Sequence, residues 1–117
     1  MRYIESYMHH NNIAVLVEFE TPDSITFSCS EFTDMAKDIA MQITATNPTG
    51  IDTPSMLNVI PIQFQSGKTD LTEEALLDQP WIKDPSITVR ELIAQVSALL
   101  KTPIRITRFC RYDVDDT

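Results

Sequence analysis

Glycine, cysteine and histidine are scarce in this sequence of 117 residues, which contains two of each. Two glycines cannot build a glycine-rich phosphate-binding loop. The cysteines, Cys29 and Cys110, lie far apart without neighbouring ligand residues, so neither a zinc site nor a disulfide framework is predicted. The longest strongly apolar run, Ile13–Val17, is far shorter than the roughly 20 residues that span a bilayer. The sequence therefore predicts no nucleotide-binding loop, no metal, no cofactor and no membrane segment.

Basic residues are also few, with 9 lysines and arginines against 17 aspartates and glutamates and a net charge of −8. Because like charges repel, this balance argues against nucleic acid or an anionic membrane as a partner. A basic patch on another protein is a compatible partner for a chain with this negative charge. The first residues, M-R-Y-I-E-S-Y, have neither signal-peptide nor transit-peptide character, so a cytoplasmic location is the default expectation.

The two histidines do not form a convincing catalytic or metal site. His9 and His10 lie at a predicted hairpin tip, which is exposed rather than closed around a substrate. Adjacent residues on a strand point to opposite faces, so this pair is a poor chelator. The residues therefore predict that the protein is not an enzyme and has no catalytic residue.

Two strands are predicted at the start of the chain, Arg2–His9 and Ile13–Glu20, because apolar residues alternate along both. Asparagine tolerates positive φ, so His10–Asn12 suits a tight hairpin connection. Both faces of the second strand are partly apolar, since Ala14 and Leu16 oppose Ile13, Val15, Val17 and Phe19. We expect a helix to cover one face of the sheet, and a second subunit is a candidate cover for the other.

The strongest helical pattern lies between Phe27 and Pro48. Ser28 is predicted to cap this helix together with Glu31, and Phe27 to pack on Phe32 as a hydrophobic staple. Pro48 is expected to end it, because the residue before a proline avoids the helical region. The apolar face of the helix has the 3.6-residue period and consists of Phe32, Met35, Ala36, Ile39, Ala40 and Ile43.

An irregular segment, Pro48–Lys68, follows, because prolines and glycines interrupt its pattern. Within it, Ile60–Phe64 is predicted to be an edge strand or an extended loop. Asp70 is expected to cap a short helix through Ala75–Leu77, and Gln79–Pro85 is expected to be extended.

A second helix is predicted from Thr88, which forms a capping box with Glu91, to just before Pro103. Its expected apolar face consists of Leu92, Ile93, Val96, Leu99 and Leu100.

The last predicted strand is Ile104–Val114. Its alternation places Ile104, Ile106, Cys110 and Val114 on one face, although Arg108 and Phe109 break the pattern. Three arginines of this strand, Arg105, Arg108 and Arg111, are expected to pair with the protein's own carboxylates. The order of elements predicts a single α+β domain over residues 1–117, with a small antiparallel sheet of about three strands and helices packed mainly on one face.

Several segments resemble the core, or dimerisation, domain of translation elongation factor Ts: Ile4–Glu18, Glu31–Pro48, Leu76–Ile93 and Ile104–Val114. The resemblance implies binding to elongation factor Tu and acceleration of GDP release. It also implies that His9, with His10 beside it, lies in a contact region for that partner. It further implies that the cysteine of the R-F-C-R stretch, Cys110, lies in a homodimer interface.

The sequence departs from the family at its exchange motif, a Thr-Asp-Phe triplet in the loop before the long helix. Asp23, Ser24 and Ile25 occupy those positions and become the predicted partner-binding residues of the loop. The family's N-terminal helical domain, with its threonine-glycine-alanine-glycine motif, also has no match here. Losing an aspartate's charged hydrogen bonds costs about 1.5–3 kcal/mol and trimming phenylalanine to isoleucine about 1 kcal/mol, which predicts exchange weaker by roughly a hundredfold or more.

Two hypotheses follow from this resemblance and its departures. In the first, the protein binds elongation factor Tu but catalyses nucleotide exchange weakly. In the alternative, it is a self-associating interaction module that has the fold and no exchange activity.

Overall fold

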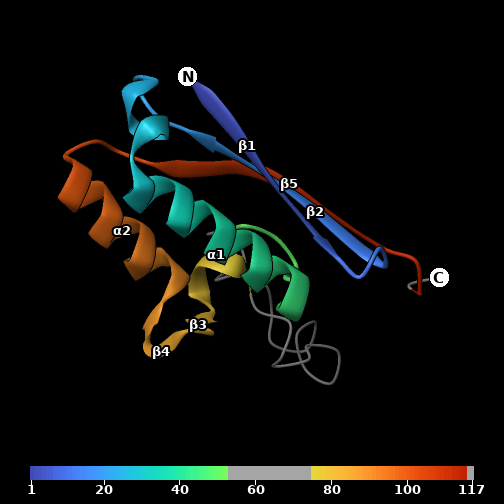
Figure 1. Ribbon diagram of the computed structural model, residues 1–117. Coiled ribbons are helices and arrows are strands. Elements are labelled where there is room, and N and C mark those ends of the chain that lie inside the picture. The colour runs from blue at the N-terminus through green and yellow to red at the C-terminus, as the bar shows by residue number, and fades with distance from the viewer. Residues whose placement is uncertain (53–74, 116–117) are drawn as a thin grey trace, which may run out of the picture.

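The computed structural model describes residues 1–52 and 75–115, which form an α+β fold (Figure 1). Its strands are β1 (Arg2–His9), β2 (Ile13–Glu20), β3 (Pro80–Trp81), β4 (Asp84–Thr88) and β5 (Arg105–Asp113). Its helices are α1 (Ser30–Thr46) and α2 (Val89–Leu100), with two short 3₁₀ helices, η1 (Ile25–Ser28) and η4 (Leu76–Asp78). The predicted fold class is confirmed.

The main sheet is antiparallel, with β2 in the middle of the order β1-β2-β5. The register pairs Arg2 with Glu20 and His9 with Ile13, so the β1–β2 hairpin tip and the start of the following loop lie at opposite ends of the sheet. The hairpin turn carries positive φ at both His10 and Asn11, and Asn12 donates its backbone N–H to the carbonyl of His9 at 2.9 Å. The predicted tight connection is confirmed.

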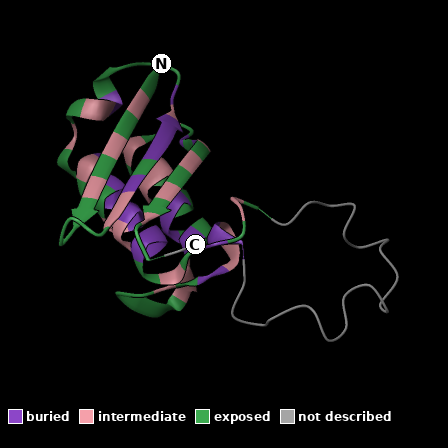
Figure 2. Cartoon of the chain, turned by 90° about the vertical axis from the view of Figure 1, so that its right-hand side faces the viewer, coloured by how far each residue is buried: buried purple, intermediate pink, exposed green. Residues whose placement is uncertain are grey.

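The hydrophobic core lies between the sheet and α1. The predicted helix face is fully buried, and it packs with Val15, Val17 and Phe19 of β2. Tyr3 and Tyr7 of β1 pack against the same core, whereas Ile4 and Met8 are exposed on the other side of the sheet. Figure 2 shows the buried residues concentrated on the middle strand and on the helices behind it. On the other side of the sheet, the outer face, no element of residues 1–52 and 75–115 packs against these strands.

Helix α1 begins later than the sequence predicts. Ser28 belongs to η1, and the N-cap is Cys29, which makes no side-chain capping hydrogen bond. The predicted capping box of Ser28 and Glu31 is therefore wrong, because the 3₁₀ turn occupies the residues that the box would need. The expected contact of Phe27 with Phe32 is present, with ring centroids 5.3 Å apart. The helix ends at Asn47, which is left-handed at φ 49° directly before Pro48, as the proline predicts.

Helix α2 begins as predicted, because Thr88 and Glu91 form a reciprocal capping box. The Thr88 hydroxyl accepts from the Glu91 backbone at 3.1 Å, and the Glu91 carboxylate accepts from the Thr88 backbone at 2.9 Å. The predicted apolar face is wrong at Leu99, which is 62% exposed. At 100° per residue, Leu99 lies about 80° around the helix from the buried Val89, so it falls at the edge of the packed side.

Strand β5 contains a β-bulge that the sequence does not predict. Glu18 pairs with Arg108 and Phe19 pairs with Ile106, so Thr107 is an extra residue on β5. Beyond the bulge the alternation shifts by one residue, which places Cys110 on the outer face although Ile106 faces the core. The expectation that Cys110 shares a face with Ile106 is therefore wrong, and the break that Arg108 and Phe109 make in the pattern is explained.

The segment predicted to be extended, Gln79–Pro85, instead turns back on itself, because β3 and β4 form a small antiparallel hairpin. The buried amide of Gln42 holds this hairpin to α1: it donates to the Pro80 carbonyl at 3.0 Å and accepts from the Ile82 backbone at 2.9 Å. The short helix expected at Ala75–Leu77 is η4. The predicted strand at 60–64 and the cap at position 70 lie outside the described residues.

Candidate functional site

The sequence-predicted site residues fall in three separate places: the β1–β2 hairpin tip, the loop between β2 and α1, and the outer face of the sheet. Strands of eight residues separate the tip from the loop, which corresponds to roughly 24 Å. The structure therefore does not bring His9 and His10 together with Asp23, Ser24 and Ile25. A partner that contacts both groups must extend along the sheet.

The hairpin tip presents an exposed aromatic cluster. The His9 and His10 rings lie edge to face with centroids 4.2 Å apart, and the Tyr7 hydroxyl lies 3.2 Å from His9 Nδ1. Among the described residues, no group of three or more histidine, cysteine, aspartate or glutamate side chains could hold a metal ion. The tip offers imidazole and phenol groups that can exchange hydrogen bonds with a protein partner.

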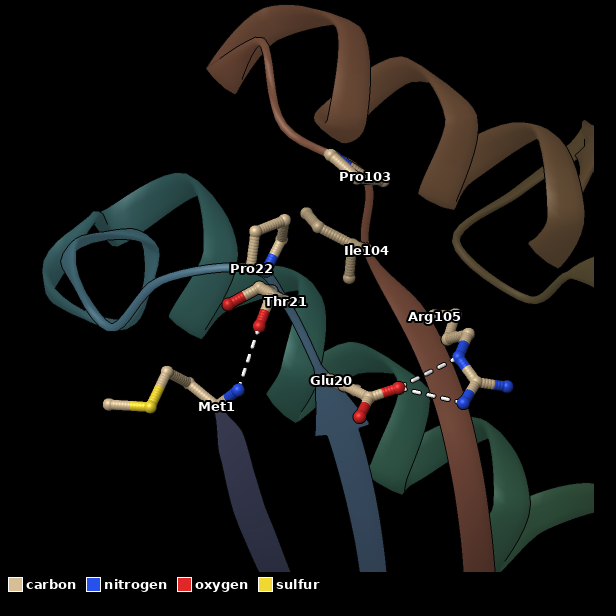
Figure 3. A pocket seen from close by; sticks show the side chains of 7 residues that line it. All are labelled: Met1, Glu20, Thr21, Pro22, Pro103, Ile104 and Arg105. Atoms are coloured by element: carbon tan, nitrogen blue, oxygen red, sulfur yellow. Dashed lines mark hydrogen bonds and ion pairs between the residues drawn. The ribbon is translucent and has the colours of Figure 1, made fainter.

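The loop between β2 and α1 is fixed at its base by β1. The amino group of Met1 donates to the Thr21 carbonyl at 2.9 Å, and the Thr21 backbone donates to the Met1 carbonyl at 3.0 Å. Figure 3 shows Thr21 and Pro22 beside Pro103 and Ile104, around a shallow hollow of about 360 Å³. These two hydrogen bonds hold the base of the loop to the first residue of the chain.

The tip of this loop exposes an apolar side chain. Ile25 is 74% exposed, the largest exposed fraction of any large apolar side chain among the described residues. Below it, Phe27 packs on Tyr3 and Phe32 with ring centroids 5.2 and 5.3 Å apart, and Thr26 is buried. Because the neighbours of Ile25 are anchored in the core, its position relative to the sheet is well defined.

Asp23 and Ser24 use their side chains differently within the loop. Asp23 Oδ1 accepts from the Ile25 backbone at 3.1 Å and from the Thr26 backbone at 3.4 Å, so the carboxylate is used inside the loop. Ser24 is the N-cap of η1 but makes no side-chain capping hydrogen bond. The loop thus exposes an aliphatic side chain, Ile25, and the hydroxyl of Ser24.

The outer face of the sheet has an apolar half near the hairpin tip. The register places Leu16 beside Cys110, and Ala14 between Met8 and Tyr112. The larger apolar side chains of this half, Ile4, Met8, Leu16 and Tyr112, are all exposed. Cys110 is exposed as a free thiol among them. Sequence reasoning missed Tyr112 as part of this face, because the bulge that brings it there carries no clear signal.

The other half of the outer face is charged. Arg105 donates to one Glu20 oxygen through Nε at 2.9 Å and Nη2 at 2.7 Å, and Arg108 contacts both Glu18 oxygens at 3.2 Å. Arg111 lies on the opposite, helix-covered side of the sheet, where it pairs with Asp113 at 3.4 Å and donates to the Thr44 carbonyl of α1 at 3.1 Å. The expectation that these three arginines pair with the protein's own carboxylates is confirmed.

Hydrogen bonds stabilise the ionised form of both glutamates in this half. The Thr107 hydroxyl, at 2.6 Å, and then the Arg108 guanidinium hold the pKa of Glu18 below its usual value. The guanidinium of Arg105 lowers the pKa of Glu20 in the same way. The charged half is therefore a set of paired groups, in contrast to the apolar half beside it.

No helix in the described ranges is long and apolar enough to cross a membrane.

Comparison with known proteins gives a consistent family. A family model described as Elongation factor TS matches residues 1–59, which contain β1, β2, the loop and α1. The chain is 30% identical to the elongation factor Ts of Alkaliphilus metalliredigens, over 97% of the chain and 63% of the relative. It is 35% identical to a chloroplastic elongation factor Ts of Phaeodactylum tricornutum, over 93% of the chain and 66% of the relative. For the elongation factor Ts of Thermodesulfovibrio yellowstonii, the identity is 32% over 97% of the chain and 68% of the relative.

The chain spans less than two thirds of the length of the Alkaliphilus and Phaeodactylum relatives. The name that these proteins share is that of an elongation factor and not of an enzyme, in agreement with the sequence prediction. The matched region contains both the loop with Ile25 and the hairpin tip. The chain belongs to the elongation factor Ts family.

Proposed function

We propose that this protein binds elongation factor Tu in translation elongation and that it accelerates guanine-nucleotide exchange only weakly. The observation that carries this proposal is the β2–α1 loop, which exposes Ile25 at the position where the resemblance places an aromatic ring. The hairpin tip, with His9 and His10, is the second contact region of the proposal.

Binding to elongation factor Tu can occur without acceleration of nucleotide exchange, for a physical reason. An exchange factor acts because it binds the nucleotide-free partner more tightly than the nucleotide-bound partner, and that difference is the coupling free energy. Contacts that are the same in both states, such as those of a rigid sheet edge or hairpin tip, support binding without exchange. Replacing the carboxylate by Ser24 removes a charged contact that could differ between the two states.

Calorimetric titration of the full chain into nucleotide-free elongation factor Tu tests the binding part of the proposal. We expect a one-to-one complex, and its affinity should fall when GDP is present. Absence of heat and of a co-eluting complex at high concentration would reject binding.

A second candidate function, self-association, is favoured by the apolar half of the outer face. Contiguous exposed apolar surface on a soluble protein often marks an interaction site, and here it is formed by Ile4, Met8, Leu16 and Tyr112 with Cys110 among them. In this proposal a second copy covers the face, and Cys110 lies in the homodimer interface. Sedimentation of the reduced protein as a monomer at all accessible concentrations would count against it.

We also propose a cytoplasmic location for this protein. The name of the Phaeodactylum relative places that protein in a chloroplast, so family membership alone does not fix the compartment.

A further inference from the structure

We propose that Asp23 is a positioning residue, which holds Ile25 outward as the contact of the β2–α1 loop, rather than a residue that touches the partner itself. The inference rests on the proposed binding to elongation factor Tu and assigns different roles to two residues of the same loop.

The first observation is the use of the Asp23 carboxylate. A single oxygen, Oδ1, accepts the Ile25 backbone N–H at 3.1 Å, and the Thr26 backbone and hydroxyl approach the same oxygen at 3.4 Å. The first distance is that of an ordinary hydrogen bond, and the other two are longer than usual. An aspartate that bonds the backbone two residues further on fixes a turn, so the carboxylate determines the direction in which the chain carries Ile25.

The second observation is that anchored residues flank Ile25 on both sides. Before it, Thr21 is buried and bonded to Met1. After it, Thr26 is buried and Phe27 packs in the aromatic cluster with Tyr3 and Phe32. The Phe27 backbone donates to the Ser24 carbonyl at 3.1 Å, which closes the 3₁₀ turn around Ile25.

The side chain of Ile25 determines the chemistry of the complementary site. It carries no hydrogen-bonding group, and its branching at Cβ leaves few rotamers to lose on binding. Complete burial of an isoleucine side chain corresponds to roughly a 10- to 100-fold change in dissociation constant. A preformed turn adds to that effect, because less ordering is needed when the complex forms.

The test is a double-mutant cycle on the dissociation constant for elongation factor Tu, measured by calorimetry with the full chain. We expect Ile25→Ala to weaken binding roughly tenfold and Asp23→Ala to weaken it roughly threefold to tenfold. Asp23→Asn keeps a carbonyl oxygen at the same position and should stay within about twofold of wild type. The key result is coupling: in the Ile25→Ala background, Asp23→Ala should have no further effect.

Asp34→Ala is the matched control, since it removes an exposed aspartate of α1 and should leave the affinity unchanged. A merely structural role for Asp23 would lower the melting temperature without coupling to Ile25 in binding. The proposal is overturned if Asp23→Asn weakens binding as much as Asp23→Ala, or if the two alanine effects are additive. A wild-type protein that forms no complex at all overturns the proposed function and this inference with it, whereas unchanged affinity in every variant overturns the inference alone.

Discussion

The Glu18 carboxylate lies at the boundary between the charged and apolar halves of the outer face. It is bonded by Thr107 and Arg108, and Arg2 lies 3.6 Å away. Thr107 reaches it only because the bulge leaves this residue without a partner in the register. The irregularity in β5 thus has a role, because it supplies the hydroxyl that bonds a buried carboxylate.

The first prediction concerns the pH dependence of stability. Hydrogen bonds lower the folded-state pKa of Glu18 below its ordinary value of 4.5, so the ionised group stabilises the fold above that pH. This contribution is lost as the pH falls below 4.5 and through the folded pKa. Urea denaturation at pH 7 and at pH 3 should therefore show a smaller difference in unfolding free energy for Glu18→Gln than for wild type.

Thr107→Val provides the matched variant, because the threonine hydroxyl is the largest cause of the lowered pKa. Like Glu18→Gln, it should show a smaller difference in unfolding free energy between pH 7 and pH 3 than wild type. If the unfolding free energy changed with pH by the same amount in wild type and in both variants, the role assigned to Glu18 would be contradicted.

The residues of the β2–α1 loop show what a sequence can and cannot predict. The resemblance predicts Asp23, Ser24 and Ile25 as contacts of the functional loop. It does not predict the hydrogen bond that the Asp23 carboxylate accepts from the Ile25 backbone at 3.1 Å, because that bond depends on how the chain turns after Thr21. A residue type alone does not contain that information.

Individual elements were predictable where their signals are local. The capping box of α2 is contained in four consecutive residues, Thr88 to Glu91, and the structure contains it as predicted. The similar pattern at Ser28 and Glu31 failed, because a 3₁₀ turn before α1 competes for the same residues. The bulge in β5 depends on the partner strand β2, so no local pattern in β5 could reveal it.

The second prediction uses these two patterns as a matched pair. Thr88→Ala should destabilise the protein by about 0.5–2 kcal/mol, because the Glu91 backbone loses its capping partner. Ser28→Ala should change the unfolding free energy by less than about 0.5 kcal/mol, since the exposed Ser28 is not a cap. Chemical denaturation of both variants measures the difference, and equal losses would show that the assignment of the caps is wrong.

For the molecule as a whole, the arrangement separates three surfaces. The loop lies at one end of the sheet and the hairpin tip at the other, and the outer face lies between them, opposite the helices (Figure 1). The strand pattern predicted that both faces of β2 are partly apolar, and the structure agrees. Which molecule covers the outer face depends on a partner, and a single chain contains no such information.

The third prediction tests self-association through that face. Leu16→Glu places a charge at the centre of the apolar half, where burial against a second copy would be costly. If the wild type sediments as a dimer, the variant should sediment as a monomer with an unchanged circular dichroism spectrum. Asp34→Asn, on the opposite side of the fold, is the control and should leave the dimer intact. A dimer that survives Leu16→Glu would place the interface elsewhere.

We propose that the protein keeps the docking surface of the elongation factor Ts family while its loop supports exchange only weakly. The most direct measurement is the release of fluorescent GDP from elongation factor Tu, with wild type compared with the double variant Ser24→Asp, Ile25→Phe. We predict slow release with wild type and acceleration by roughly a hundredfold in the double variant at the same concentration. Wild-type release that already equals that of the variant would contradict the claim, as would a variant that accelerates nothing.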